Sequence, residues 1–143
     1  MGEEKGSYSV FDHTADVGLE VRASSRASLY ETAAAALFDV MFERSGSAGE
    51  WIELEVEVEA IDEEELLVRW LSELLFLYDT RGVVLEEFRI SEISGTRLKA
   101  GIGGRAYDES AHRLKTEIKA ITYHDLSIRR MGESWQARLV IDV

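Results

Sequence analysis

Apolar and polar residues alternate near the amino terminus and again near residue 55, as they do in half-buried β-strands. In the segment 52–58, isoleucine, leucine and valine alternate with glutamate, so one face is apolar and the other is negatively charged. Shorter alternating segments cover residues 8–11 and 18–23, and the polar stretch between them is typical of a turn. We therefore expect the first two strands to pair with each other.

Two longer segments have apolar residues at the three- and four-residue spacing of an amphipathic helix. The first covers residues 29–41, and Ser28 is its predicted N-cap. The second covers residues 66–78, with Asp62 as the predicted N-cap and Gly82 as the residue that follows its end. Each helix has a broad apolar stripe, and such a stripe is expected to pack on a sheet.

The pattern after residue 82 is β-like throughout, and the intervals between apolar segments are too short for crossover helices. The predicted strands cover residues 84–93, 98–102, 116–120, 126–130 and 135–143. Two strands, a helix, a strand, a helix and then several strands predict an α+β fold. We expect a two-layer α/β sandwich in which two helices pack on a mostly antiparallel mixed sheet. With 143 residues, no internal repeat and no linker, the chain 1–143 is predicted to be a single domain.

Charge is distributed unevenly along the chain. Residues 1–95 carry 7 Lys and Arg against 22 Asp and Glu, a net charge of −15, whereas residues 96–143 carry 9 against 6, a net charge of +3. The acidic part repels phosphate backbones, so we do not expect tight binding of nucleic acid by this chain alone. The acidic surface either maintains solubility, meets a basic protein or gathers cations.

Composition excludes several classes of protein. The chain has no cysteine, which excludes disulfides, thiolate metal sites and cysteine nucleophiles. It has no apolar run of membrane-spanning length and no signal-peptide layout at its start, so we expect a cytoplasmic protein that does not enter the membrane. P-loop, dinucleotide and nucleophile-elbow motifs are also missing, and the glycine-rich segment 101–104 is interpreted as a hairpin turn.

The three histidines do not have the close spacing of a zinc site. They are His13, His112 and His124. His124 lies between Tyr123 and Asp125 and is a candidate acid–base group. A partly buried, hydrogen-bonding histidine within a strand is the favoured interpretation, because that is the commoner role of histidine in folded domains.

Carboxylates gather at two places in the sequence. Asp12 and Asp16 flank the first turn, and their two carboxylates and the hydroxyl of Thr14 offer hard oxygen ligands for Ca²⁺ or Mg²⁺. The alternative is an Asx-type turn in which Asp16 accepts hydrogen bonds from backbone amides. Asp142 stands beside the α-carboxylate of Val143, and an ordered chain end would favour a cation between the two negative charges. The alternative there is a frayed, solvated end.

Four segments taken together resemble the archease family. They are Phe-Asp-His-Thr-Ala-Asp-Val-Gly at 11–18, Leu-Val-Arg-Trp-Leu-Ser-Glu-Leu-Leu at 67–75, Glu-Ile-Lys-Ala-Ile-Thr-Tyr-His at 117–124 and Ile-Asp-Val at 141–143. Each segment alone is unspecific. The four occur in the family's order in a chain of the family's length, and the resemblance runs from end to end.

The resemblance implies a small α/β sandwich protein that is not an enzyme and that activates an RtcB-type RNA ligase in tRNA splicing. In that scheme the ligase attaches GMP from GTP to its own histidine with a divalent metal, and the accessory protein accelerates this step and permits multiple turnover. The implied metal ligands are Asp16, Asp142 and Val143. Ca²⁺, Mg²⁺ and Mn²⁺ are the implied cations. Many relatives end in Asp-Ile, and the valine here changes little because ligation would use main-chain oxygens.

The sequence also allows other hypotheses about function. Lys119 either reaches a phosphate or an acidic partner residue, or is a solvated strand lysine. A chaperone would need a sizeable apolar surface patch. A metal-dependent phosphoester hydrolase would use Asp12, Asp16 and Asp142, with His13 as the base. The sequence determines neither the oligomeric state nor whether the protein contacts tRNA.

Overall fold

The computed structural model describes residues 6–13 and 16–143. The elements in chain order are β1 (Gly6–His13), β2 (Asp16–Ala23), α1 (Arg26–Met41), β3 (Phe42–Arg44), β4 (Trp51–Glu59), α2 (Glu63–Arg81), β5 (Val83–Ile93), β6 (Arg97–Ala106), β7 (His112–Leu114), β8 (Ala120–Ile121), β9 (Ser127–Met131) and β10 (Ser134–Asp142). The predicted α+β class is confirmed, with two helices and more residues in strands than in helices. Neither helix in this part of the chain is long and apolar enough to cross a membrane.

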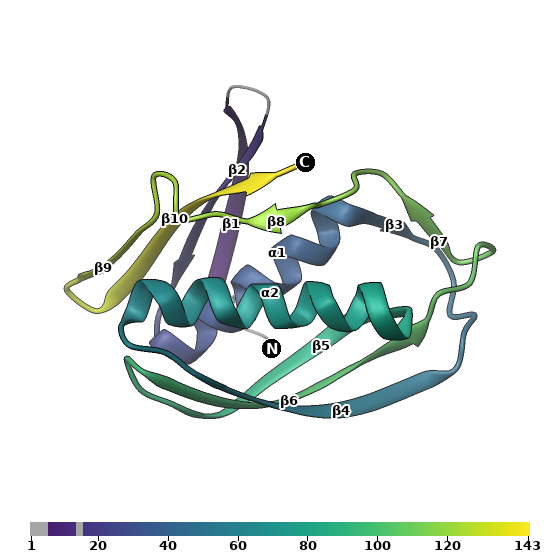
Figure 1. Cartoon of the computed structure of the whole chain (residues 1–143), viewed down its shortest axis with the longest axis horizontal. Coiled ribbons are helices and arrows are strands. Elements are labelled where there is room, and N and C mark those ends of the chain that lie inside the picture. Colours follow the sequence, from purple (N-terminus) through teal and green to yellow (C-terminus); the bar gives the residue numbers. More distant parts are fainter. Residues whose placement is uncertain (1–5, 14–15) are drawn as a thin grey trace.

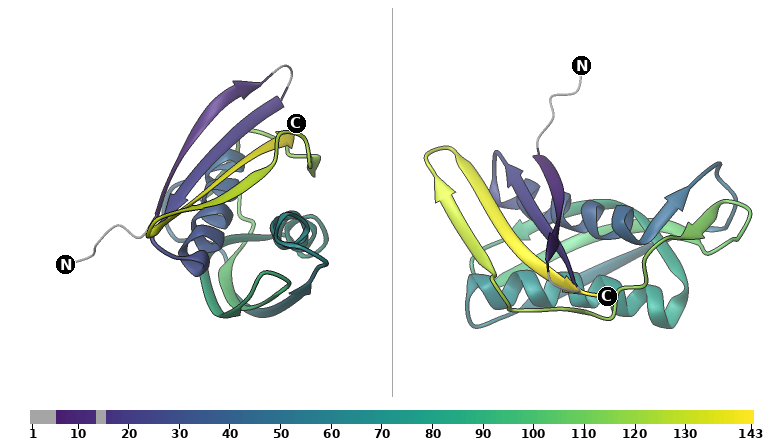
Figure 2. Two further views of the ribbon diagram at one scale, coloured as in Figure 1. Left: turned by 90° about the vertical axis from the view of Figure 1, so that its left-hand side faces the viewer. Right: turned by 90° about the horizontal axis from the view of Figure 1, so that it is seen from above.

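The strands divide between three sheets instead of forming one mixed sheet. The five-stranded sheet has the order β1-β2-β10-β8, with β9 also paired to β10, and the three-stranded sheet has the order β4-β6-β5. Strands β3 and β7 form a separate pair. All of these pairings, within the described residues, are antiparallel. Both helices contact strands of the two larger sheets and lie between them (Figures 1 and 2), which explains why a single sheet does not form.

The predicted N-cap residue is wrong for α1 and correct for α2. The hydroxyl of Ser25 accepts a hydrogen bond from the amide of Ser28 at 3.1 Å, so Ser25 is the N-cap and the prediction of Ser28 is wrong. Ser28 lies instead in the buried first turn. For α2 the prediction is confirmed, because Asp62 accepts from the amide of Glu65 at 2.8 Å and Gly82 adopts a left-handed φ of 64° after the last turn.

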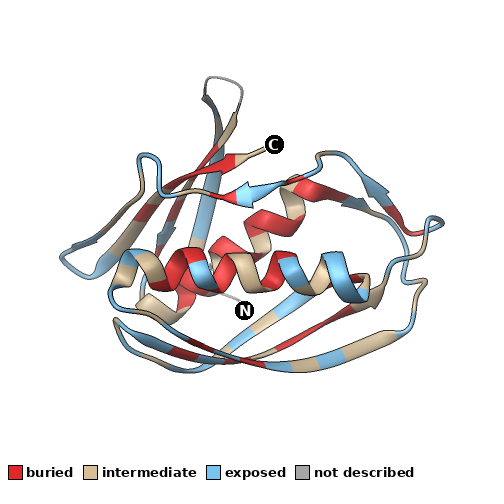
Figure 3. Ribbon diagram, viewed as in Figure 1, coloured by how far each residue is buried: buried red, intermediate tan, exposed pale blue. Residues whose placement is uncertain are grey.

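The core fills the space between the helices and the inner faces of the two larger sheets (Figure 3). Trp70 of α2 is fully buried, and its indole N–H donates to the carbonyl of Tyr30 at 3.0 Å. The hydroxyl of Tyr30 donates to the carboxylate of Glu63 at 2.8 Å, and burial followed by this carboxylate raises the pKa of the phenol. The two helices are therefore joined by buried hydrogen bonds as well as by apolar contact.

Two predictions after residue 82 need correction, and one strand pair was missed. The glycine-rich segment 101–104 is not a hairpin turn but lies inside β6, where missing side chains admit close neighbours. A Cβ on Gly104 would lie 2.2 Å from the carbonyl oxygen of Val84. Of the predicted strand 116–120 only Ala120 lies in a strand, as the first residue of the two-residue β8. The short pair β3 and β7 was not predicted, because three-residue strands have too little periodicity to be detected.

Candidate metal site

Asp16 and Asp142 lie directly opposite each other in the five-stranded sheet. Asp16 is the first residue of β2 and Asp142 is the last residue of β10, and the antiparallel register pairs them. Residues paired in this way project to the same face with Cβ atoms about 5 Å apart. Both residues are half-buried. The fold thus unites the two carboxylates that the sequence placed at opposite ends of the chain.

The two carboxylates belong to the outer face of the sheet, away from the helices. Along β2, Leu19 and Val21 are fully buried and face the core, so Asp16 and the other even-numbered residues face outward. Next to Asp16 on this face, the ring of Phe11 covers Gly18, since a Cβ on that glycine would lie 2.1 Å from the ring. Gly18 is therefore the position that lets an aromatic ring brace the hairpin beside the carboxylates.

Arg138 also contacts the Phe11 ring, and together with Gly18 and Phe11 it forms the contact that we call the brace. The guanidinium group of Arg138 lies 4.0 Å from the centre of the Phe11 ring and donates to the carboxylate of Glu20 at 2.8 Å. These residues come from β1, β2 and β10, so the contacts tie together the three strands that carry the candidate site. The sequence analysis missed this brace, although a glycine inside an alternating strand signals close approach of a neighbour.

Asp142 is held on its other side as well. It pairs with Ala120 of β8, and its carbonyl accepts a hydrogen bond from the amide of Lys119 at 2.8 Å. Val143 is half-buried and packs against the core. The end of β10 thus lies between two neighbouring segments, which differs from the frayed end considered as the alternative.

The donor set fits a hard divalent cation, with ligands still to be supplied. Two carboxylates and the main-chain oxygens of Val143 are the oxygen donors that Ca²⁺, Mg²⁺ and Mn²⁺ prefer. Directly opposed like charges repel each other, and a cation between Asp16 and Asp142 would remove that repulsion. The described residues contain no group of three or more His, Cys, Asp or Glu side chains able to hold a metal. A cation of this kind takes six or more ligands, so further ligands would have to join these donors.

The other members of the first turn do not all join the site. Asp12 pairs with Val17 in the register, one position away from Asp16, so it projects to the opposite face of the sheet. This placement does not support a hydrolase that uses Asp12 and Asp142 together. His13 is paired with Asp16 along the backbone, and its side chain lies outside the described residues, as do Thr14 and Ala15.

The two remaining histidines lie outside the candidate site's strand pairing. His112 is 4% exposed, and its Nδ1 accepts a hydrogen bond from the amide of Asp108 at 3.0 Å. Burial lowers the pKa of His112, which favours a neutral, structural imidazole. His124 does not lie within a strand and is not partly buried, contrary to the favoured interpretation. It is exposed in the turn between β8 and β9, with its Nε2 3.5 Å from the carboxylate of Asp125.

Lys119 lines a cavity that the sequence did not reveal. The cavity has a volume of about 710 Å³ and lies between the end of α2 and the segment 114–119. Tyr78, Tyr107 and Leu114 also border it. Lys119 is exposed. The residue therefore joins the two regions, since its amide holds Asp142 and its side chain borders the cavity.

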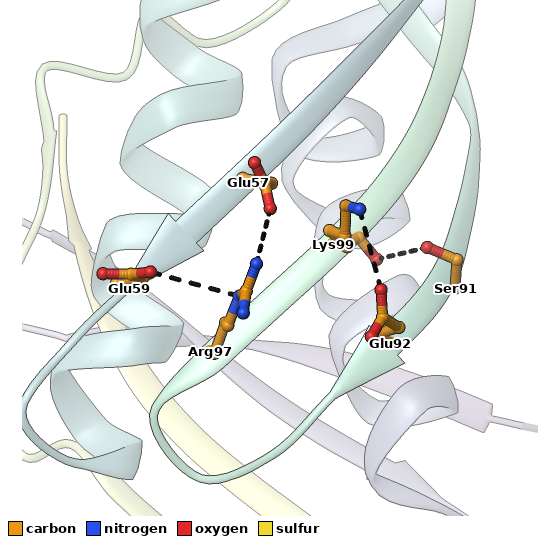
Figure 4. Close-up of polar contacts among 6 residues, drawn as sticks. All are labelled: Glu57, Glu59, Ser91, Glu92, Arg97 and Lys99. Atoms are coloured by element: carbon orange, nitrogen blue, oxygen red, sulfur yellow. Dashed lines mark hydrogen bonds and ion pairs between the residues drawn. The ribbon is translucent and has the colours of Figure 1, made fainter.

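Carboxylates also concentrate on the outer face of the three-stranded sheet, where they face basic residues (Figure 4). Arg97 lies 2.9 Å from Glu57 and 4.0 Å from Glu59, and Lys99 lies 3.7 Å from Glu92. All of these side chains are about half exposed or more. Their charges are balanced by neighbours, so this surface is a weaker candidate for a cation site.

Comparison with known proteins identifies relatives of the whole chain. Residues 8–143 match the model of the archease protein family (MTH1598/TM1083). The "Protein archease" of Methanosarcina barkeri is 34% identical over 147 residues, covering all of both chains. That of Thermococcus gammatolerans is 40% identical over 138 residues, covering 93% of this chain and 96% of the relative.

Solved structures agree with this assignment. The solution structure of Methanobacterium thermoautotrophicum protein 1598 has a TM-score of 0.76 and 31% identity, covering 95% of this chain and 98% of that protein. The crystal structure of a Thermotoga maritima archease, described as a possible chaperone, has a TM-score of 0.64 and 24% identity, covering 93% and 94%, and shows the fold alone. From the family match and the full-length relatives, we conclude that this chain belongs to the archease family.

Proposed function

We propose that this chain is a non-catalytic accessory protein of the cytoplasm that activates an RtcB-type RNA ligase in tRNA splicing. In the proposal, Asp16, Asp142 and Val143 hold a divalent cation that the activation requires. The observation that carries the proposal is the direct pairing of Asp16 with Asp142 on the outer face of the five-stranded sheet, in a chain of the archease family. The expected effects on the ligase are faster attachment of GMP and multiple turnover.

Within the part of the chain that the structure describes, the ligand set is incomplete, and this supports action on a partner. The two carboxylates would hold the cation from one side, and the remaining positions would be open to ligands that the ligase or its nucleotide provides. When bound there, the cation would supply positive charge for phosphate oxygens. The main-chain amide of Lys119 donates to the carbonyl of Asp142 at 2.8 Å and so holds the end of β10 in place beside the neighbouring segment.

The placement of Asp12 favours an accessory role over a hydrolase built on Asp12, Asp16 and Asp142. A hydrolase needs a water-activating base next to its metal. Asp12 projects to the face of the sheet opposite Asp16 and Asp142, and the side chain of His13, the base of the hydrolase hypothesis, lies outside the described residues. In our proposal the nucleotide chemistry belongs to the ligase, and this chain positions a cation for it.

The test is the rate of covalent GMP attachment to the cognate ligase with GTP and Mn²⁺. We expect stimulation by the wild-type protein and a loss of at least about tenfold of that stimulation in Asp16→Asn and in Asp142→Asn, because each removes a charged ligand. Glu57→Gln is the matched control, since it removes the same charge from the three-stranded sheet. Stimulation by both aspartate variants at the wild-type rate would refute the role of the cation site.

A chaperone role is the second candidate, and one surface feature favours it. Tyr107 and Leu114 are 45% and 42% exposed and border the same cavity, which offers apolar contact to an unfolded chain. The Thermotoga relative is described as a possible chaperone. If this role is correct, the protein will suppress aggregation of several unrelated proteins, and Leu114→Lys will weaken the suppression while Asp142→Asn will not.

A further inference from the structure

Strand β1 is an edge of the five-stranded sheet within the described residues. It pairs with β2 on one side through all eight of its residues, without a register shift, and no described strand pairs with its other side. Alternate residues of such an edge direct their amide and carbonyl groups outward. Figure 2 (left) shows β1 as the outermost strand of its sheet. The edge is therefore a regular template for another strand.

The two edges of the three-stranded sheet are protected in ways that β1 is not. Edge strand β4 carries glutamate at every second position from Glu53 to Glu59. Edge strand β5 has two register shifts, and the amide of Ile90 donates to the carboxylate of Glu31 at 2.9 Å. Charges, bulges and side-chain caps all discourage strand addition. Between Gly6 and Phe11, β1 has no charged side chain and no register shift.

The inner side of β1 also exposes apolar surface. Tyr8 is 39% exposed and Val10 is 51% exposed, and both border a groove of about 320 Å³. The groove is completed by residues of β2, α1 and the segment after β7, including Asp39 and Lys115 at its rim. The carboxylate of Asp39 is engaged within its own subunit by Arg44 and by the hydroxyl of Tyr8, so the contact that the groove offers a second copy is the apolar one made by Tyr8 and Val10.

We propose that β1 pairs antiparallel with β1 of a second copy of this chain, about a two-fold axis that passes through Ser9. The two five-stranded sheets would then form one continuous sheet. Ser9 would lie opposite Ser9 of the partner subunit, and Tyr8 opposite Val10 of the partner subunit, so that the exposed apolar side chains cover each other. Asp12 would lie opposite Gly6 of the partner subunit, and no like charges would be paired in the ladder.

The pleat of the strand restricts the alternatives to this register. Only registers that oppose residues of the same parity keep Tyr8 and Val10 on the inner face of both copies. An axis through Val10 would oppose Tyr8 with Asp12, and an axis through Tyr8 would shorten the described ladder. The axis through Ser9 pairs residues 6–12 and opposes apolar residues with apolar residues.

The dimer leaves the candidate cation sites accessible. Asp16 and Asp142 lie on β2 and β10, one and two strands away from the proposed seam. A two-fold axis perpendicular to the sheet would place both sites on the same outer face. Each copy has a net charge of −12, so repulsion opposes association, and we expect the dimer to become tighter as salt concentration rises.

Cysteine cross-linking tests the register directly, because the chain has no cysteine of its own. Opposed residues have Cα atoms about 4.5–5.5 Å apart, which suits a disulfide. Ser9→Cys should therefore form disulfide-linked dimers under mild oxidation. Ser7→Cys is the matched control on the same face, and its two copies would be about 14 Å apart. We expect cross-linking of Ser9→Cys to be at least tenfold faster, and equal rates would overturn the proposed pairing.

Sedimentation equilibrium over a range of protein concentrations tests the dimer without an added cysteine. We expect Val10→Lys to raise the dimer dissociation constant at least tenfold. Met131→Lys is the control, since Met131 is similarly exposed at 55%, belongs to the same sheet and gives the same charge change. A wild-type protein that stays monomeric at all concentrations overturns the proposal. Protection of the β1 amides only after a different protein is added would assign the edge to that partner instead.

Discussion

The outer faces of the two larger sheets differ in what lies opposite their carboxylates. On the three-stranded sheet, Glu57 lies opposite Lys99 and Glu59 lies opposite Arg97, so acidic residues of β4 face basic residues of β6. On the five-stranded sheet, Asp16 lies opposite Asp142. Opposite charges across a strand pair stabilise it modestly, whereas like charges destabilise it unless something is bound between them. The first arrangement pairs opposite charges, and the second pairs two carboxylates, which is an arrangement that a divalent cation can bridge.

This difference shows that the number of carboxylates is a poor guide to a cation site. The glutamates of β4 are the most conspicuous acidic pattern in the sequence, and they form ion pairs with neighbouring strands. The aspartates of the candidate site are two isolated residues far apart in the chain. Cross-strand register, which joins them, is the property that separates a balanced surface from a candidate site.

The largest effect that we predict is stabilisation of the protein by a divalent cation. At a Ca²⁺ concentration of about a thousand times the dissociation constant, binding to the folded state alone adds about 4 kcal/mol to the free energy of unfolding. For a chain of this size, that corresponds to a rise in Tm of about 10 °C. Differential scanning calorimetry with Ca²⁺, Mn²⁺ or a chelator measures the shift.

Two matched variants show which sheet binds the cation that raises the Tm. Asp142→Asn keeps the shape of the side chain and removes a charged ligand, so the rise in Tm should disappear. Glu57→Gln removes a carboxylate from the three-stranded sheet and should leave the rise intact. Loss of the rise in Glu57→Gln but not in Asp142→Asn would reverse the comparison between the two sheets.

The second prediction compares glycines in the two sheets. A Cβ on Gly104 would lie 2.2 Å from the carbonyl oxygen of Val84 and 2.6 Å from the Cα of Leu85, and neither backbone atom can move alone. The three atoms nearest to a Cβ on Gly18 all belong to the ring of Phe11, which can rotate away. We expect Gly104→Ala to cost about 3 kcal/mol and Gly18→Ala about 1 kcal/mol. Urea unfolding measures both, and equal costs would show that the Phe11 ring is as rigid as backbone.

The sequence predicted elements with strong periodicity and clear end signals. Helix α2, with Asp62 and Gly82 at its ends, and the alternating strand β4 were predicted closely. The N-cap of α1 was misplaced by three residues because Ser25 and Ser28 are equivalent by composition, and only their backbone conformations distinguish them. Local signals thus succeed where one residue has a unique role and fail where two candidates compete.

Long-range pairing could not be predicted from periodicity. Alternation shows which residues share a face of a strand, but it does not show which strand is the neighbour or in what register. The division into separate sheets and the brace of Phe11 against Gly18 are of this kind. The candidate ligands came from the family resemblance, and their use as ligands stays a prediction. The register adds that two of them are paired on one face.

The third prediction concerns Tyr8 on β1, the edge strand of the five-stranded sheet, and the pH dependence of the stability that its hydroxyl contributes. Burial, followed by the hydrogen bond of 2.8 Å from its hydroxyl to Asp39, raises the pKa of Tyr8 to about 12. A pKa raised in the folded state stabilises the protein fully below pH 10, and this contribution is lost as pH rises from 10 to 12. After allowance for solvent screening we expect a loss of about 1 kcal/mol.

Tyr8→Phe isolates this contribution from those of the other tyrosines. The difference in unfolding free energy between the wild type and Tyr8→Phe should shrink between pH 10 and pH 12. Tyr30 remains in both proteins, so its own resistance to ionisation cancels in the comparison. A difference that is independent of pH over this range would mean that the hydroxyl of Tyr8 does not hold the edge strand to Asp39.

The smallest predicted effect concerns the ion pairs of the three-stranded sheet. The hydrogen bond from Arg97, followed by the charge of Lys99, lowers the pKa of Glu57. A carboxylate whose pKa is lowered in the folded state stabilises the protein at pH values above its ordinary pKa of 4.5. This contribution is lost as the pH falls through the lowered pKa. In Arg97→Ala, the pKa of Glu57 should rise in a carbon-detected NMR titration, while the Tm at neutral pH should barely change, because exposed ion pairs are screened by solvent. If Arg97→Ala instead lowers the Tm as much as Gly104→Ala does, the charges of this sheet contribute to its folding, and the contrast with the opposed aspartates loses its energetic basis.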